Sequence, residues 1–319
     1  MTSTDHKTAP GFFTTWRVAV RPFAYTASLF PVLLGVAVSS RLGFSVSWLR
    51  LAVTVVGVMG FHTAGNLLSD CFDYRRGLDR EVHPRSGAIV RGWISPKQAL
   101  RAGVVLFLVG SVCGIYLVHA AGWVVLLLGV LGAFLSVGYT CPPLSLKYRG
   151  LGDLCVFLSF GVLPLFGSFW VQAETFAWQP LLWSLPPSLL TVGILHANNW
   201  RDRRTDPARG CRTPASLLGE KGSAVYYCLL VVLPFVLLVG YVGLAHVPGV
   251  EFPAPAAVLL ALFSVPLAIR LCHRAFAILK EGDRDSLADL DALTAQTHLA
   301  FNLLLLAGFV AGSFLSGAA

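Results

Sequence analysis

Charged residues are scarce in this chain. Only 13% of its 319 residues are Asp, Glu, Lys or Arg, whereas soluble globular proteins carry about 25%. Hydrophobic residues make up 55% of the chain, and the mean hydropathy is +0.71. A water-soluble protein of this size exposes too much surface to bury so many apolar side chains. The composition therefore argues against a soluble all-α bundle and favours a polytopic helical membrane protein.

Cysteine motifs and a secretory leader are also lacking. The seven cysteines form no CxxC pair and no even framework, so we expect small buried hydrophobic residues rather than disulfides. The polar N-terminus up to Thr15 has no apolar core followed by a small-residue cleavage site. Insertion into a membrane is therefore expected to depend on the first spanning helix.

Long apolar segments are what the chain has in abundance. A membrane-spanning helix needs about 20 apolar residues. Nine segments meet this requirement, so we expect an all-α protein with nine transmembrane helices. We expect a single domain over residues 1–319, in which residues 1–17 form a polar cytoplasmic segment. The predicted spans are 18–39, 46–69, 98–118, 121–139, 151–172, 179–199, 223–244, 255–275 and 297–316.

The basic residues predict the orientation. If the N-terminus lies in the cytoplasm, every Lys and Arg except Arg41 and Arg50 falls on the cytoplasmic side, which is the asymmetry that governs membrane topology. The net charge of +8 is therefore better explained by topology than by nucleic-acid binding. We expect a multi-pass protein of a bacterial-type inner membrane, with its functional groups at the cytoplasmic face.

Two acidic clusters follow the second and sixth predicted spans. Asn66, Asp70 and Asp73 have the spacing i, i+4, i+7, which places them on one helical face. Asn198, Asp202 and Asp206 have the spacing i, i+4, i+8 and also share a face. Four spans separate the clusters, which suggests two similar four-helix halves and a ninth helix, with the clusters facing each other across a central cavity.

The chemistry of these clusters suits a diphosphate. Carboxylate and amide oxygens without nearby His or Cys ligands favour hard cations, and Mg²⁺ is usually held by a few carboxylates together with substrate phosphates. The same loops are rich in Lys and Arg, which bind phosphate oxygens. Surface ion pairs and helix caps are the alternative for individual arginines. That alternative does not explain why Asn and Asp share a helical face twice.

The residues resemble the UbiA superfamily of intramembrane prenyltransferases, and most closely its 1,4-dihydroxy-2-naphthoate polyprenyltransferase (MenA) branch. The resemblance covers nearly the whole chain and is most specific from Asn66 to Asp79, from Gly138 to Gly161 and from Asn198 to Gly219. The chain departs from the family's first motif at Ser69 and Gly77. Cys211 stands where the branch usually has Lys. Lys147 looks more like the 4-hydroxybenzoate branch.

The resemblance implies a helical bundle with a central cavity open to the cytoplasmic side. It also implies Mg²⁺-dependent transfer of a polyprenyl group from polyprenyl diphosphate to an aromatic acceptor, here 1,4-dihydroxy-2-naphthoate in menaquinone biosynthesis. Metal and bases would stabilise the leaving diphosphate while the ring attacks an allylic cation. Tyr139 would stabilise that cation or accept the ring proton, or it is an interfacial aromatic anchor. The expected metal ligands are Asn66, Asp70, Asp73, Asn198, Asp202 and Asp206, with Asp79 and Asn199 as secondary candidates; the expected diphosphate ligands are Lys147, Arg75, Arg76 and Arg204.

Three other functions remain open from sequence. A secondary transporter would place ionisable residues near the middle of the bilayer, whereas this chain keeps its acids at one face. A membrane lipid phosphatase would use a His or Ser nucleophile rather than paired Asn-x3-Asp faces. Another acceptor within the same superfamily, such as 4-hydroxybenzoate, is the strongest alternative.

Asp153 is interpreted as an acid at a helix N-terminus, and His62 and His196 as packing residues.

Overall fold

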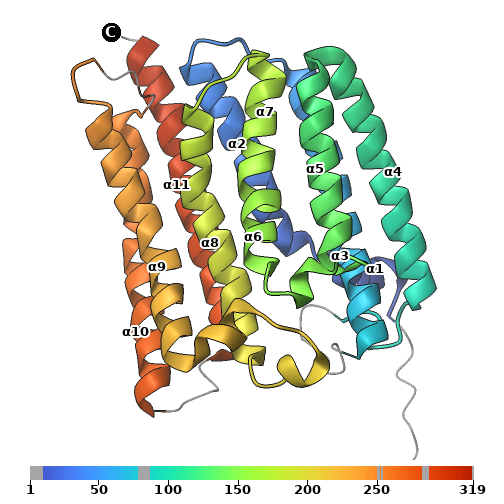
Figure 1. The fold of residues 1–319 in the computed structure, drawn as a ribbon. Helices are drawn as coiled ribbons and strands as arrows, with labels where there is room; N and C mark the ends of the chain where they lie inside the picture. The colour runs from blue at the N-terminus through green and yellow to red at the C-terminus, as the bar shows by residue number, and fades with distance from the viewer. Residues whose placement is uncertain (1–9, 78–86, 250–251, 253, 282–286, 318–319) are drawn as a thin grey trace, which may run out of the picture.

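The computed structural model describes residues 10–77, 87–249, 252, 254–281 and 287–317. Within these ranges the protein is a bundle of helices with no strand (Figure 1). Nine of the described helical segments are long and apolar enough to cross a membrane, which confirms the predicted number. Their bounds are Phe12–Arg41, Trp48–Arg76, Pro96–Ala121, Trp123–Thr140, Gly152–Ala173, Gln179–Asp202, Pro214–Leu244, Ala256–Lys280 and Leu290–Ser313.

Six of these segments are formed by one helix each. The helices are α3 (Trp48–Arg76), α4 (Pro96–Ala121), α5 (Trp123–Thr140), α8 (Gln179–Asp202), α9 (Pro214–Leu244) and α11 (Leu290–Gly317). Local sequence explains several of their ends. Ser47 and Ser95 cap the N-termini of α3 and α4 with their hydroxyl oxygens. Gly77 follows the end of α3 at Arg76, and its positive φ of 70° suits glycine.

The other three segments are interrupted. The first is α1 (Phe12–Val20), the turn η1 (Pro22–Tyr25) and α2 (Thr26–Arg41), and between them Arg21 takes a left-handed conformation. The fifth is α6 (Gly152–Phe157), the π-turn η3 (Leu158–Val162) and α7 (Leu163–Ala173). The eighth joins the 3₁₀ segment η5 (Ala256–Ser264) to α10 (Val265–Glu281). The first interruption is important for function because Arg21, which lies at the break, contributes to a site described below, and so does the start of α6.

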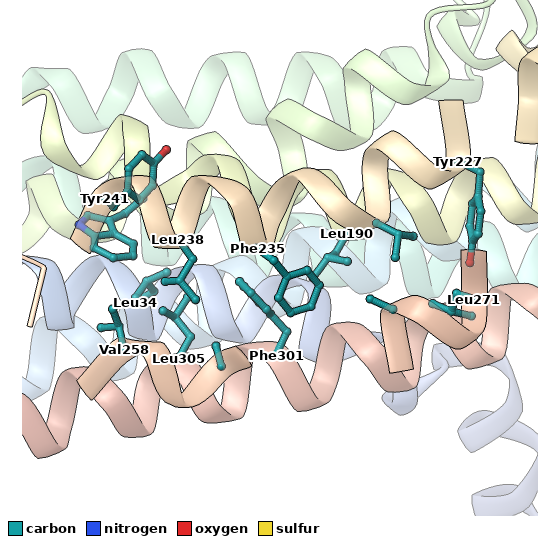
Figure 2. Packing of buried hydrophobic residues seen from close by; sticks show 14 of the residues in the cluster. Leu34, Leu190, Tyr227, Phe235, Leu238, Tyr241, Val258, Leu271, Phe301 and Leu305 are labelled. Carbon is teal, nitrogen blue, oxygen red and sulfur yellow. The ribbon is translucent and has the colours of Figure 1, made fainter. Parts of the chain in front are cut away.

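The largest core joins α2 to the C-terminal helices. Phe235 on α9 packs edge-on against Phe301 on α11, with ring centroids 5.2 Å apart, and Leu238 lies beside Leu305 in the same layer (Figure 2). Large apolar side chains remain exposed along the outward faces of α4, α5 and α9. Such a continuous apolar surface is expected where helices face lipid, which accounts for the excess of hydrophobic residues.

Glycine allows a close contact between the fifth span and α8. A Cβ at Gly161, in η3, would lie 2.5 Å from the Cβ of Ser188 on α8. Any side chain at this position would therefore force α8 away from the fifth span. The contact matters for function because α8 carries the second acidic cluster.

The two ends of the bundle differ. The C-terminal ends of α3, α5 and α8 lie at the lower end in Figure 1, and α11 ends at the upper end. Arg50, one of the two basic residues that the topology left on the opposite side, joins three elements at that upper end. It donates to Glu174 Oε1 at 2.5 Å and to the carbonyl oxygens of Val171 at 2.9 Å and Ala120 at 2.6 Å.

Candidate active site

The first acidic cluster lies at the lower end of α3. Asn66, Asp70 and Asp73 are all within this helix, so the predicted shared face is present. Asp70 and Asp73 are buried, with 7% and 4% of their surface exposed. Two carboxylates at a membrane-spanning helix end need compensating charge or hydrogen bonds, because an uncompensated buried charge is strongly unfavourable.

The compensating groups come from other parts of the chain. Arg21, at the break between α1 and η1, forms an ion pair with Asp70. Lys147 Nζ lies 2.7 Å from Asp73 Oδ2, and the Tyr148 hydroxyl donates to Asp73 Oδ1 at 2.5 Å. Both residues belong to the short 3₁₀ segment η2 (Leu146–Tyr148) after α5. The fold therefore builds this cluster from three separate segments.

The Asp73 carboxylate changes the acid–base properties of both partners. Burial alone would lower the pKa of Lys147, but the neighbouring Asp73 carboxylate raises it, and the net result is a pKa well above the ordinary 10.5. Burial raises the pKa of the Tyr148 hydroxyl, and Asp73 raises it further. Lys147 is therefore a permanent cation and Tyr148 a permanent hydrogen-bond donor at physiological pH.

Cations and an aromatic ring border this cluster. The Arg76 guanidinium lies 4.0 Å from the centroid of the Tyr148 ring and donates to Ser145 Oγ at 3.0 Å. Arg75 is exposed and lies 5.8 Å from the Phe72 ring centroid. Tyr139, near the end of α5, is within electrostatic range of Lys147, Asp73 and Asp153. Of the predicted diphosphate ligands, Lys147 and Arg76 are thus the two that adjoin the buried carboxylates.

The second acidic cluster is less regular than predicted. Asn198 and Asp202 lie on α8, but the helix ends at Asp202, so the prediction that Asp206 shares this helix is wrong. Asp206 lies in the following turn, where its N–H donates to the Asp202 carbonyl at 3.0 Å. This bond keeps Asp206 one turn beyond Asp202. Residues 203–206 form a turn after the helix, and Pro207 begins the 3₁₀ segment η4 (Pro207–Arg209).

Arg201 organises the second cluster. Its Nε and Nη2 atoms each lie 3.1 Å from a carboxylate oxygen of Asp202, and Nη2 also donates to Asn198. Nη1 lies 3.3 Å from Asp291 Oδ2 on α11. Asp202 remains open to solvent, with 43% of its side chain exposed. Arg204, a predicted diphosphate ligand, is exposed, and Asn199 is buried and donates to Asp153 Oδ1 over a long 3.5 Å.

The segments that follow α5 and α8 bring the clusters into one region. The Arg212 N–H donates to the Tyr148 carbonyl at 3.1 Å, and Arg149 pairs with Arg212 in an isolated β-bridge. Cys211, next in the chain, is within electrostatic range of Asp206 and also of Asp73 and Lys147. Burial, followed by the charge of Asp206, raises the pKa of the Cys211 thiol to about 11. The structure thus connects the Asp73 side to the Asp206 side through η2 and the segment after η4.

The donor chemistry fits a bound cation completed by a ligand. Among the described residues, no three His, Cys, Asp or Glu side chains form a ready-made cage. The carboxylates instead occur as two pairs that are supplied with Arg and Lys. This is the arrangement expected for Mg²⁺, which is bound by one or two carboxylates plus substrate phosphates rather than by an all-protein cage. Asp79, a secondary candidate ligand, lies outside the described residues.

Sequence reasoning missed four contributors. The sequence analysis assigned none of Arg21, Tyr148, Arg201 and Asp291 to the site. The structure pairs each of them with a predicted acid or with the cation that binds one. Only the position of Arg201 next to Asp202 gave any sequence signal. The other contacts join residues that are far apart in the chain, which hydropathy and helical periodicity do not predict.

Comparison with known proteins finds related sequences. The pattern of the UbiA prenyltransferase family matches residues 28–277. The chain is 33% identical over 261 residues to UbiA prenyltransferase domain-containing protein 1 of Xenopus tropicalis, a match covering 81% of this chain and 72% of that protein. It is 30% identical to the 1,4-dihydroxy-2-naphthoate octaprenyltransferase of Bacillus subtilis, over 71% of this chain and 73% of that enzyme.

A solved structure shares the fold. The structure of a UbiA homolog from Archaeoglobus fulgidus bound to GPP and Mg²⁺ superposes with a TM-score of 0.59, at 14% identity, over 91% of this chain and 99% of that one. At that identity the likeness concerns the fold alone. Together with the family match over more than half of the sequence, it confirms the expected bundle architecture. This chain belongs to the UbiA prenyltransferase family.

Proposed function

We propose that this protein transfers a polyprenyl group from a polyprenyl diphosphate to 1,4-dihydroxy-2-naphthoate, the aromatic ring of menaquinone biosynthesis. The observation that carries the proposal is the pair of buried carboxylates on α3, each held by a cation from elsewhere in the chain and connected through η2 to the second pair after α8. Membership of the family supports the transferase chemistry.

The carboxylates are the proposed metal ligands. Asp70 and Asp73 on one side and Asp202 and Asp206 on the other, with Asn66 and Asn198, would hold Mg²⁺; the homologue from Archaeoglobus fulgidus was solved with that ion and GPP. When bound, Mg²⁺ neutralises charge on the diphosphate and makes it a better leaving group. Asp202 is exposed enough to exchange its contact with Arg201 for a new ligand.

The basic residues are proposed to bind the diphosphate. Lys147 keeps its charge because of Asp73, and the Arg76 guanidinium lies over the face of the Tyr148 ring. Positive groups held in place before the reaction stabilise negative charge that develops on the leaving oxygen without reorganising first. Tyr139 is proposed to face the allylic carbon from the membrane side, where its ring stabilises positive charge.

The apolar surroundings are proposed to serve the prenyl chain. The outward faces of the helices are apolar and suited to lipid, so a long prenyl tail can remain in the bilayer while its diphosphate reaches the polar end. Water must be kept from the allylic centre, because it would capture the cation. From the charge bias we propose that the N-terminus and this polar end face the cytoplasm, and that residues 1–319 act as one catalytic domain.

Two observations favour the naphthoate as acceptor. Asn66 and the Gly77-Leu-Asp79 ending resemble the naphthoate branch, and the Bacillus subtilis octaprenyltransferase is a relative over most of both chains. Lys147, which resembles the 4-hydroxybenzoate branch, makes that ring the second candidate. The vertebrate relatives are similarly distant, at 33% to 35% identity, and do not distinguish the two.

The test is a transfer assay with matched acceptors. Membranes containing the protein are incubated with radiolabelled geranylgeranyl diphosphate, Mg²⁺ and either 1,4-dihydroxy-2-naphthoate or 4-hydroxybenzoate, with Asp202→Asn membranes as control. A lipid-soluble product that forms with the naphthoate, needs Mg²⁺ and is absent from the variant supports the proposal. Product with 4-hydroxybenzoate alone keeps the chemistry and changes the acceptor. No product with either ring, from folded protein, contradicts the proposed function.

A further inference from the structure

A second polar cluster lies deeper in the bundle than the carboxylate pairs. Asp153 is on α6, Tyr226 is on α9, and His196 and Asn199 are on α8, before Asp202. His196 has no exposed surface, and Asp153 and Asn199 are also buried. His196 precedes Asp202 by six residues, which is about 9 Å along a helix. The cluster is therefore displaced toward the interior of the membrane from the proposed diphosphate site.

Asp153 is the centre of this cluster. Its Oδ2 atom lies 3.6 Å from His196 Nδ1, and its Oδ1 atom accepts the long hydrogen bond from Asn199. The Tyr226 hydroxyl also interacts with the Asp153 carboxylate, and the Tyr226 ring packs edge-on against His196 with centroids 4.7 Å apart. The sequence-based interpretation of Asp153 as a simple helix-start acid is thus incomplete, because its carboxylate faces three side chains from other helices.

His196 differs from the other buried histidines of the bundle. His62 Nδ1 lies 2.7 Å from Ser28 Oγ, and His298 Nε2 lies 3.2 Å from Thr191 Oγ1. Neither ring nitrogen of His196 has a hydrogen-bond partner among the described residues. A fully buried imidazole without partners is costly in a membrane-spanning segment. A ligand group that hydrogen-bonds to His196 would remove that cost.

The cluster adjoins the carboxylate site through Tyr139. The Tyr139 hydroxyl is 3.8 Å from the place where a side chain at Gly152 would begin, next to Asp153 in the chain. The same tyrosine is within electrostatic range of Asp73 and Lys147 on one side and of Asp153 on the other. A molecule held at His196 would therefore lie beside the leaving diphosphate, with Tyr139 between them.

We propose that Asp153, His196, Asn199 and Tyr226 form the binding site for a hydroxyl group of the aromatic acceptor. The carboxylate of Asp153 favours an N–H on His196 Nδ1, which leaves Nε2 free to accept a hydrogen bond from a phenolic hydroxyl. A ring without that hydroxyl leaves the imidazole unpaired, so the site selects hydroxylated rings over their ethers. This inference rests on the proposed function, because it concerns the acceptor of the same reaction.

The test compares KM for the aromatic acceptor with KM for the diphosphate in purified wild-type and variant protein. With saturating geranylgeranyl diphosphate, His196→Gln and Asp153→Asn are expected to raise KM for 1,4-dihydroxy-2-naphthoate by about tenfold, the effect of losing one buried hydrogen bond, while KM for the diphosphate stays within about twofold. Tyr226→Phe is expected to have a smaller effect in the same direction. His298→Gln and Tyr227→Phe are the matched controls, since both residues are buried but bond to residues outside this cluster.

A substrate analogue distinguishes acceptor binding by His196 from a purely structural role of that residue. Wild-type protein should discriminate against the monomethyl ether of the naphthoate, and His196→Gln should lose most of that discrimination. Equal changes in both KM values together with a lowered Tm, or an unchanged acceptor KM, would overturn the inference while leaving the proposed function intact. Wild-type protein that prenylates no hydroxylated ring would instead overturn the proposed function, and the inference with it.

Discussion

The two acidic clusters are similar in sequence but differ in how the fold holds them. Asp70 and Asp73 are almost fully buried, and their partners Arg21, Lys147 and Tyr148 come from distant segments. Asp202 is 43% exposed, and its cationic partner is the adjacent Arg201. The first cluster is therefore built by tertiary structure and the second mostly by local structure.

This difference follows from the cost of burying charge. A buried carboxylate must be paired, and removing one partner leaves the other as an uncompensated buried charge. An exposed carboxylate is solvated by water, and its pairing contributes little to stability. The first cluster is thus expected to contribute to the stability of the fold as well as to the site, whereas the second is expected to contribute little to stability.

The largest expected effects are those of replacing one acid in each cluster, which should reduce activity in both cases but stability in only one. Asp73→Asn and Asp202→Asn should each reduce prenyl transfer by at least about a hundredfold, because each removes a charged ligand of the proposed site. Only Asp73→Asn should also destabilise the protein, by roughly 2 kcal/mol or more, because Lys147 loses its buried partner. Transfer assays and thermal unfolding of the purified variants measure the two effects. Equal losses of Tm would contradict the comparison.

The pH dependence of the first cluster should depend on Asp73. Asp73 holds the pKa of Lys147 above 10.5 in the folded protein, so the contribution of the ammonium group to stability is complete below about pH 10 and is lost only as the pH rises through the raised pKa. In Asp73→Asn burial acts without the carboxylate and lowers the pKa of Lys147, so the buried ammonium group destabilises the folded state until it loses its proton, and stability should increase as the pH rises. Tm measured from pH 7 to pH 10.5 should be nearly flat for wild type and rise for the variant. Parallel curves would show that Asp73 does not set the charge of Lys147.

Two neighbouring arginines test the boundary of the first cluster. Both arginines are exposed, but Arg76 contacts Tyr148 and Ser145, whereas Arg75 contacts only Phe72 among the described rings. Arg76→Ala should raise KM for the diphosphate by about tenfold, the loss of one charge-assisted bond, and Arg75→Ala by less than about threefold. Steady-state kinetics at saturating acceptor measure both. A larger effect of Arg75→Ala would place the phosphate on the other side of α3.

The smallest effect concerns the thiol between the clusters. Burial raises the pKa of Cys211 to about 11, so the reactive thiolate is nearly absent at pH 8. Cys211 should therefore react with N-ethylmaleimide more slowly than unstructured thiols at pH 8, and its rate should increase as the pH approaches 11. Mass spectrometry of the labelled peptide gives the rate, with the unfolded protein as reference. Rapid labelling of the folded protein at pH 8 would show that the junction of the two segments is open.

Several features could be predicted from the sequence because they depend on local pattern. The nine spans follow from runs of about 20 apolar residues, and the shared face of Asn66, Asp70 and Asp73 follows from helical periodicity. The same periodicity failed at Asp206, where α8 ends at Asp202 and a turn leads to Pro207. Local spacing could not show that the helix stops between two residues with the right separation.

The sequence by itself determined that the chain is a helical membrane bundle with acids and bases at one end, because hydropathy and charge act over short stretches. Only the tertiary structure decided which base meets which acid. Arg21 with Asp70, Lys147 with Asp73, and Asp153 beside His196 are separated by 43 to 74 residues in the chain. Such pairs form because buried charges must find partners once the helices have packed, and that requirement is met in space rather than along the sequence.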